Sequence, residues 1–331
     1  SVVVPNTDGL KGIRAAVAAG IIAGDAEGEL QVITRVPREL RAAIAAYAED
    51  TPIQVSCSAA TRMLDIRLTG WRDGHWAVTH IANSHTNLIH VERDGTVLLD
   101  HPADDSPESG LTDKSLLDLR DILTFADTVD LSRVTPLLDR QIQCNTAIAE
   151  EGLLHDWGAN IGSIRLKCRG SSIQNEAAAW AAAGSDARMS GCEMPVVINS
   201  GSGNQGMTAS LPVIRYAGYL KAEREQLYRA LLVSNLVTIY QKAGIGRLSA
   251  YCGAISAGVG AGAAIAYLQG GDYDAVAHTI TNAVAILSGT ICDGAKPSCA
   301  AKIASAVDAG ILGYEMYRNG QNFHGGDGIL G

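Results

Sequence analysis

Aromatic side chains are scarce in this 331-residue chain, and positive charge is also in short supply. The sequence has two Phe, four Trp and ten Tyr, and its 26 basic against 35 acidic residues give a net charge of −9. Proteins that bind nucleic acid need an excess of Lys and Arg for the phosphates, and many add aromatic platforms for the bases. The composition therefore argues against nucleic acid as a partner.

Long, strongly apolar runs are also missing. The charge-free stretch 253–271 consists mainly of Gly and Ala and includes Ser256 and Gln269, so it predicts a buried helix and not a membrane span. The first residues show no basic and apolar leader pattern. We expect no membrane partner and a cytoplasmic protein.

Cysteine is present in an odd number, with seven residues in a large chain. This composition is untypical of a disulfide framework and favours reduced thiols, some of them packed in the core and some available to a metal.

Residues 1–128 mix helical and strand-like patterns. Helices are expected at 10–20, capped by Asn6, Thr7 or Asp8, and at 37–47, with Pro37 in the first turn. The sequences Arg-Asp-Gly at 72–74 and 93–95 are typical of turns between antiparallel strands. The expected strands are 2–4, 30–36, 53–57, 63–71, 75–81, 88–92 and 97–100, followed by a polar connector at 101–114.

From residue 115 onward, apolar residues recur at helical spacing. The sequence predicts an α+β protein, with an N-terminal α/β domain holding an antiparallel sheet (1–128) and an all-helical catalytic domain (129–331). Helices are expected at 115–123, 207–219, 228–239, 247–269, 273–289 and 300–318.

A Gly-rich loop at 199–206 is the first candidate site. Its Gly residues allow backbone N–H groups to converge on a carboxylate or phosphate, and a helix N-terminus behind it would add partial positive charge. An ordinary surface loop is the alternative. Upstream, Asp186 and Arg188 either contact a substrate or form an ion pair that braces the loop.

Cys252, Cys292 and Cys299 form the second candidate site, with the spacing C-x39-C-x6-C. Three Cys without a fourth nearby suit an iron–sulfur cluster with one open iron, whereas zinc sites more often show paired CxxC motifs. Packing in the core is the alternative for these residues. His85, in the polar stretch 83–87, is a third candidate, either for substrate contact or as a solvated turn residue.

Taken together, these segments resemble the L-cysteine desulfidase family, which is related to the iron–sulfur L-serine dehydratases, and the likeness covers essentially the whole chain. The resemblance rests on Val2-Val3-Val4-Pro5-Asn6-Thr7, Ser84-His85-Thr86-Asn87, Ser185-Asp186-Ala187-Arg188-Met189, the loop 199–206, Arg247-Leu248-Ser249-Ala250-Tyr251-Cys252, and Ile291-Cys292-Asp293-Gly294-Ala295 with Cys299.

The resemblance implies a [4Fe–4S] enzyme that converts L-cysteine and water to hydrogen sulfide, ammonia and pyruvate. Cys252, Cys292 and Cys299 would bind three irons and leave the fourth open. We expect a small amino acid to be bound by His85, Asn87, Ser185, Arg188, Ser200, Gly201, Ser202, Gly203, Asn204 and Gln205. A homo-oligomer is also expected.

One family motif is not in this sequence. Members of the family carry a Gly-Cys-Thr-Glu-Pro stretch upstream, whose Cys is thought to be the catalytic base, so no base is assigned here. We expect parts at both ends to lie outside this sequence.

Three other functions stay open. They are an L-serine dehydratase of the same iron–sulfur type, a pyridoxal-phosphate eliminase with Lys242, Lys296 or Lys302 as the Schiff base, and a non-catalytic amino-acid-binding relative.

Overall fold

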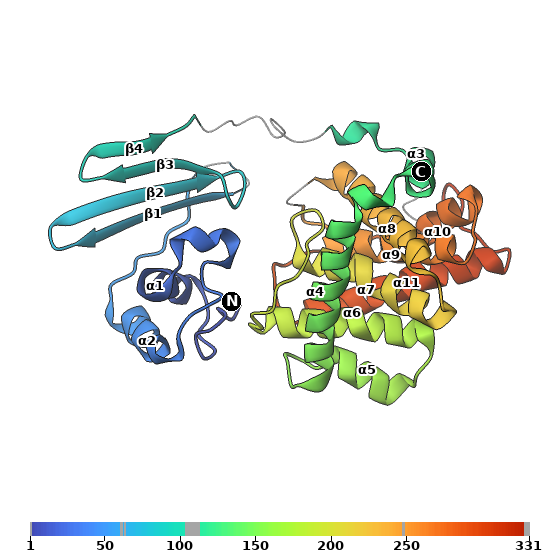
Figure 1. Cartoon of the computed structure of the whole chain (residues 1–331), viewed down its shortest axis with the longest axis horizontal. Coiled ribbons are helices and arrows are strands. Elements are labelled where there is room, and N and C mark those ends of the chain that lie inside the picture. The colour runs from blue at the N-terminus through green and yellow to red at the C-terminus, as the bar shows by residue number, and fades with distance from the viewer. Residues whose placement is uncertain (1, 60–61, 63, 103–112, 247–248, 328–331) are drawn as a thin grey trace. The chain divides into compact units, whose positions relative to one another are not determined.

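The structure is a computed structural model that describes residues 2–59, 62, 64–102, 113–246 and 249–327 (Figure 1). Its contacts divide the chain into two units. The sheet unit is Val4–Asp113, and the helical unit is Lys114–Gly331 together with Ser1–Val3. The protein is α+β, as the sequence predicts. Residues 114–128 belong to the helical unit, although the sequence pattern predicts them in the first domain.

The sheet unit contains a four-stranded antiparallel sheet in the order β1-β2-β3-β4 (Figure 1). Its strands are Asp65–Arg72, His75–Ala82, Leu88–Arg93 and Thr96–Asp100. The turns at 73–74 and 94–95 join β1 to β2 and β3 to β4, and all four turn residues have positive φ, which fits the hairpin turns that the sequence predicts.

Two helices, α1 (Ile13–Ala23) and α2 (Arg41–Asp50), form a separate small core in the same unit. Helix α1 begins at Ile13, not at residue 10, because Asn6 and Asp8 adopt left-handed φ and are used in a turn instead of a cap. Val4 and Val36, which lie outside the two helices, are buried in this core together with Ile44 of α2.

Three of the predicted strands are wrong. Segment 30–36 is a short 3-10 helix (Ala26–Gln31) followed by turns, because the Asn6 amide donates to the carbonyls of Ile33 and Thr34 and no strand pairs with them. Segments 2–4 and 53–57 form no strand either. The strand predicted at 63–71 is β1, although Met63 lies outside the described residues.

The helical unit is built around α9 (Gly253–Leu268), which packs against four other helices. Its Gly258 and Gly262 meet the backbone of α11 so closely that a Cβ at either position would collide with Ala306 or Gly310. This is why a Gly- and Ala-rich helix lies in the centre. The neighbours of α9 are α7 (Gly203–Leu220), α8 (Arg224–Ile245), α10 (Tyr273–Ile286) and α11 (Cys299–Arg318).

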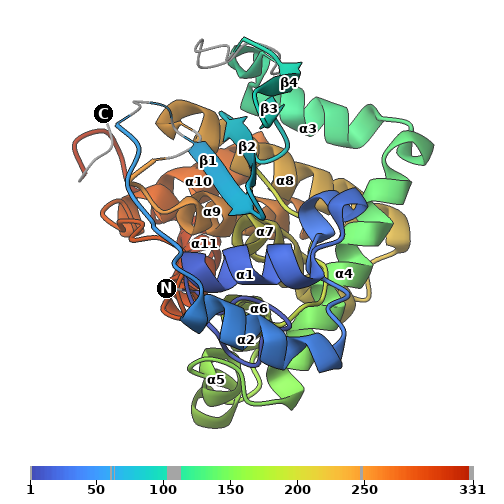
Figure 2. The same ribbon diagram turned by 90° about the vertical axis from the view of Figure 1, so that its left-hand side faces the viewer.

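The other helices of this unit surround that centre. Helix α6 packs against α4, α5, α7 and α11, and both views place α5 beside α6 at one end of the unit (Figure 1, Figure 2). Their bounds are α3 (Leu119–Thr128), α4 (Thr135–Leu154), α5 (Ile161–Arg169) and α6 (Ile173–Met189). Within the described ranges, none of the helices has both the length and the apolar character needed to cross a membrane.

Candidate functional site

Cys252 and Cys292 are brought together by a short backbone bridge. Tyr251 and Ile291 pair in antiparallel fashion, with the Cys252 N–H donating to Thr290 and the Cys292 N–H donating to Ala250. Because side chains alternate along an extended chain, the residues that flank a bridged pair share the face opposite to it. The two cysteines therefore lie on one face of the bridge, although 39 residues separate them.

Cys299 joins them from the first turn of α11. Burial raises the pKa of the Cys252 thiol, and negative charge on Cys292 and Cys299 raises it further, so both of these side chains lie within electrostatic reach of Cys252. Cys252 is buried, Cys299 is partly exposed and Cys292 is exposed. Cys252 and Cys299 thus stand at the start of α9 and of α11, with Cys292 on the bridge beside Cys252, and the three are called the thiol group below.

Lys302 and Asp293 hold the loop between Cys292 and Cys299. The Lys302 ammonium donates to Asp293 at 2.7 Å and to the Ile291 carbonyl at 3.1 Å. Hydrogen bonds from Lys302 and Lys296 lower the pKa of Asp293 to about 2, so this carboxylate is charged at neutral pH. The ion pair fixes the loop to α11, the helix that carries Cys299.

Two further cations reach the thiol group from other helices. Arg188, in the last turn of α6, is influenced by the Cys299 thiolate, and Lys242, in the last turn of α8, by Cys292 and Cys252. Burial lowers the pKa of both side chains, and the thiolates oppose the shift. Among the described residues, neither cation has a carboxylate partner. Buried charge of one sign without a counter-ion is costly, so this region is suited to anions.

The Gly-rich loop forms a tight turn at the start of α7. Asn199 and Ser202 exchange backbone hydrogen bonds, and Ser200 and Gly201 between them have positive φ. Helix α7 begins at Gly203, four residues earlier than predicted, with the Ser202 hydroxyl accepting from the Gln205 N–H. The loop therefore presents the N-terminus of a long helix, where anions are favoured.

Arg188 lies directly on this helix N-terminus. Its guanidinium donates to the Asn204 side chain at 3.2 Å, and a Cβ at Gly203 would collide with it. Of the two alternatives for Asp186 and Arg188, the ion pair does not form, because residues two apart on a helix do not face each other. Asp186 instead accepts from the Gly162 N–H at the start of α5.

The loop and the thiol group adjoin each other. The Gln205 side chain packs against Gly253, the residue after Cys252, where a Cβ would collide with it. The Gln205 Oε1 and the Ser185 hydroxyl are buried and have no hydrogen-bond partner among the described residues. Ser185 is fully buried within α6, so it lies behind the surface of the site. The structure thus brings together three sequence-predicted groups: the cysteines, Arg188 and the residues 200–205.

Asn145, Ser210 and Asn235, which support this loop, were not predicted from the sequence. The Asn145 side chain accepts from the Val197 N–H at 2.9 Å and donates to Ser210 on α7. The Asn199 amide donates to Asn235 on α8. Asn145, Ser210 and Asn235 carry no motif, and their only signal in the sequence is a polar side chain on an apolar helix face.

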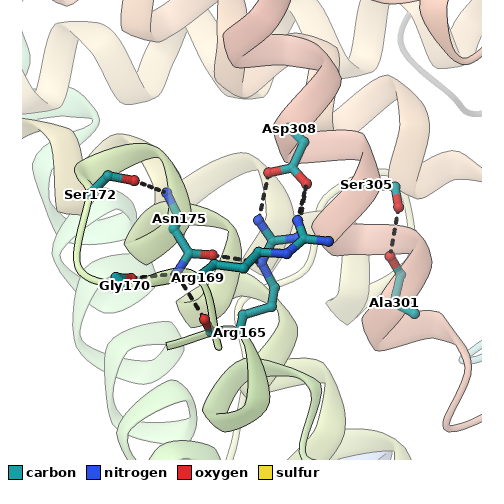
Figure 3. Close-up of polar contacts among 8 residues, drawn as sticks. All are labelled: Arg165, Arg169, Gly170, Ser172, Asn175, Ala301, Ser305 and Asp308. Atoms are coloured by element: carbon teal, nitrogen blue, oxygen red, sulfur yellow. Dashed lines mark hydrogen bonds and ion pairs between the residues drawn. The ribbon is translucent and has the colours of Figure 1, made fainter. Parts of the chain in front are cut away.

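Arg165 fixes α11 to α5 and α6 (Figure 3). Its guanidinium makes two hydrogen bonds to the Asp308 carboxylate, at 2.7 and 2.9 Å, and a third to Asn175. Helix α11 begins with Cys299, and α6 carries Arg188 in its last turn. The Arg165 contact therefore helps to set the relative position of Cys299 and Arg188.

His85 and Asn87 belong to the sheet unit, in the loop between β2 and β3. His85 is exposed, and the Asn87 amide donates to the Ala82 carbonyl and so closes the loop. Their role in substrate binding stays a prediction.

The sheet unit also has a cavity of about 490 Å³, which the sequence analysis did not predict. Arg67, His80, His90 and Asp100 stand opposite one another across the four strands and line it. Asp100 and Glu92 each bind a ring nitrogen of His90 and raise its pKa. The charges that line the cavity are therefore largely paired with one another.

Among the described residues, the thiol group does not form a ready-made site for a metal ion. Across the described ranges, no three Cys, His, Asp or Glu side chains are placed to hold one ion. In a [4Fe–4S] cluster each thiolate binds a different iron, so the sulfur atoms stand around a shared space. Three coupled thiols beside two cations that lack carboxylates suit such an anionic group.

Comparisons with known proteins point to one family. Residues 26–331 match the family model described as the serine dehydratase alpha chain. A UPF0597 protein of Desulfitobacterium hafniense (strain Y51) is 56% identical over 330 residues, covering 100% of this chain and 77% of the relative. A UPF0597 protein of Lachnoclostridium phytofermentans is 48% identical, covering 100% and 79%.

A third relative, a UPF0597 protein of Treponema denticola, is 42% identical over 336 residues and covers 100% of this chain and 78% of its own. No solved structure matches the chain. With the family model spanning both units and relatives matching from end to end, this chain belongs to the serine dehydratase alpha chain family.

Proposed function

We propose that this chain is an iron–sulfur lyase that eliminates sulfide from L-cysteine and forms pyruvate and ammonia. Membership of a serine dehydratase family supports lyase chemistry on a small amino acid. The observation that carries the proposal is the thiol group, because three coupled cysteines lie beside unpaired cations and a helix N-terminus.

The substrate carboxylate would bind at the start of α7. Arg188 lies on this N-terminus, and the N–H groups of the first turn point out of it. Asn204 keeps the guanidinium in place, and Gln205 lies between the loop and Gly253. A carboxylate held here would place the β-carbon of the amino acid toward the thiol group. Orientation of this kind lowers the barrier to elimination.

Cys252, Cys292 and Cys299 would hold the [4Fe–4S] cluster, whose open iron supplies Lewis-acid stabilisation of the leaving sulfur. In the reaction the Cα–H proton is removed, the Cβ–S bond breaks and sulfide leaves with the bonding electrons. The aminoacrylate then tautomerises and is hydrolysed to pyruvate and ammonia. No base is assigned among the residues of this chain.

The experiment is anaerobic reconstitution of the full-length gene product with iron and sulfide, followed by iron analysis and assay of pyruvate release. We expect bound iron and pyruvate from L-cysteine. Protein that is fully active without metal would contradict the cluster and favour the pyridoxal-phosphate alternative.

Cys292→Ala tests the thiol group directly. We expect it to abolish turnover and to lower the iron content, because one iron loses its thiolate. Cys168→Ala is the matched control, since Cys168 is exposed on α5 and outside the thiol group. Unchanged turnover in Cys292→Ala would refute its role.

An L-serine dehydratase is the second candidate, because the matching family model bears that description. The same open iron could bind a hydroxyl in place of a thiol. Pyruvate release measured side by side from L-cysteine and L-serine decides between the two substrates.

A further inference from the structure

Gln205 is a buried side chain whose oxygen has no hydrogen-bond partner. It is the third residue of α7, and only 7% of its surface is exposed. Among the described residues, no donor makes a hydrogen bond to its Oε1, and this atom is itself buried. A buried acceptor without a donor costs free energy, so native proteins keep few of them. The structure therefore leaves a donor to be identified at this position.

Packing alone does not account for the Gln205 side chain. Its amide lies against Gly253, where a Cβ would come within 2.5 to 2.9 Å of the amide atoms. Gly253 follows Cys252 and is the first residue of α9, so the amide lies between the first turns of α7 and α9. An apolar side chain of the same length would fill this space without burying an unpaired oxygen. The oxygen is thus the feature that needs an explanation.

The other side-chain oxygens at the start of α7 are already engaged. Asn204 Oδ1 accepts from the Arg188 guanidinium, and the Ser202 hydroxyl accepts from the Gln205 N–H. Asn199 Oδ1 accepts from the hydroxyl of the next residue. Gln205 Oε1 therefore supplies the acceptor that stays open in this part of the described structure.

This open acceptor complements the donors of the same helix turn. Arg188 and the N–H groups at the start of α7 favour a carboxylate, and the guanidinium lies where a Cβ of Gly203 would be. The ammonium of an α-amino acid is bonded to the carbon that bears the carboxylate, and it has donors only. An amino acid whose carboxylate binds at Arg188 therefore needs an acceptor close by, and Gln205 is two residues from Gly203.

We propose that Gln205 Oε1 accepts a hydrogen bond from the α-ammonium of the substrate and so selects amino acids over carboxylic acids that lack this group. The inference rests on the proposed function and deepens it, because it names the group that distinguishes the substrate class. Arg188 binds the carboxylate, which both kinds of molecule share, and Gln205 determines the specificity. A hydrogen bond to a charged group changes affinity by about 10- to 100-fold.

The test compares two ligands that cannot be eliminated, because neither has a leaving group on the β-carbon. L-2-aminobutyrate has a methyl group in place of the cysteine thiol, and butyrate is the same molecule without the amino group. Calorimetric titration of the full-length gene product, with and without the reconstituted cluster, measures both Kd values. The readout is therefore binding and does not depend on turnover.

The variants separate the oxygen of residue 205 from its shape. Gln205→Met and Gln205→Leu remove the acceptor, whereas Gln205→Glu has an oxygen at both ends of the amide position. Gln143→Leu is the matched control, because Gln143 is exposed on α4. Circular dichroism and thermal melting show which variants are folded, and two apolar side chains of different shape guard against a folding failure in either.

We expect the wild type and Gln143→Leu to bind L-2-aminobutyrate at least about tenfold more tightly than butyrate. In Gln205→Met and Gln205→Leu the two Kd values should differ by less than about threefold, because the amino ligand loses affinity and butyrate does not. Gln205→Glu should keep the preference for the amino ligand, since a carboxylate also accepts from an ammonium.

Three results would overturn the inference. A wild-type preference that persists in folded Gln205→Met and Gln205→Leu would show that another group binds the ammonium. An equal loss of affinity for both ligands would show that Gln205 only shapes the pocket. A preference lost in Gln205→Glu as fully as in Gln205→Met would show that the oxygen is not responsible.

The proposed function fails in a different way. Wild-type protein that binds neither ligand and releases no pyruvate from L-cysteine would refute the proposed function itself. Wild-type protein that releases pyruvate but binds the two ligands equally would refute only the role of Gln205.

Discussion

Arg188 combines two roles at the residue scale, since it lies on the N-terminus of α7 and within reach of Cys299. Its side chain has no carboxylate partner among the described residues, so its guanidinium is available to bind an anion. An arginine recognises a carboxylate through charge-assisted hydrogen bonds, which are stronger than neutral ones.

Arg188→Gln should therefore weaken substrate binding more than it weakens turnover. A hydrogen bond to a charged group contributes roughly 1.5–3 kcal/mol, so KM should rise by about 10- to 100-fold. Steady-state kinetics of pyruvate release measures both constants. Arg140→Gln, at an exposed position on α4, is the control. An unchanged KM would remove Arg188 from the substrate site.

Asp186 is a fully buried carboxyl whose pKa is raised to about 6 by burial, in spite of backbone hydrogen bonds that lower it. A folded-state pKa above the unfolded value means that the folded protein binds the proton more tightly. The stability from this group is therefore complete below about pH 4 and is lost as the pH rises through about 6.

Asp186→Asn should flatten the pH dependence of stability between pH 4 and pH 7, by no more than about 3 kcal/mol across that range. Asparagine keeps an oxygen for the Gly162 N–H but has no charge to bury. Urea unfolding at several pH values measures the effect, with exposed Asp274→Asn as control. Parallel curves for wild type and Asp186→Asn would contradict this account.

At the scale of elements, the site depends on helices that approach each other closely. The Cα atoms of Gly262 on α9 and Gly310 on α11 face each other where no Cβ fits. Because both helices begin at a cysteine of the thiol group, their packing also fixes the distance between Cys252 and Cys299.

Gly262→Ala should force α9 and α11 apart and destabilise the protein by roughly 1–3 kcal/mol, as overpacking of a filled core does. Gly218→Ala on α7 is the matched control, because a Cβ there meets nothing and alanine favours the helix. Chemical denaturation measures both. Equal stability of the two variants would show that α9 and α11 can move apart at their contact without loss of stability.

The elements were predictable where local chemistry decides them. The Asp-Gly turns at 73–74 and 94–95 specify their hairpins, because those residues accept positive φ. Segment 30–36 was predicted as a strand from its apolar residues alone. Its carbonyls are instead taken by the Asn6 side chain, which no local pattern reveals.

At the scale of the whole molecule, the proposed cluster should couple the stability of the helical unit to iron. A group that binds only the folded state raises its stability by mass action. We expect removal of iron by a chelator to lower the melting temperature of the reconstituted wild type by several degrees.

Calorimetry with and without chelator measures this shift. It should be absent in Cys252→Ser, which loses one cluster ligand, and preserved in Cys57→Ser, whose cysteine is exposed in the sheet unit. A shift in Cys252→Ser as large as in the wild type would place the iron elsewhere.

The boundary between the two units depends on packing and not on local sequence patterns. The sequence shows helical spacing from residue 115, yet only contacts show that α3 packs against α8 and α10 and so belongs with the helical unit. The helices themselves were largely predictable, because apolar spacing repeats over several turns.

The sequence by itself determined the fold class and the hairpin turns, and it supplied the candidate site residues. Helical periodicity, turn chemistry and the spacing of cysteines are properties of neighbouring residues. Only the tertiary structure decided that Cys252 and Cys292 share one face of a bridge and that Arg188 lies on α7 instead of pairing with Asp186. Such placements depend on long-range packing and on burial, and no local sequence pattern encodes either.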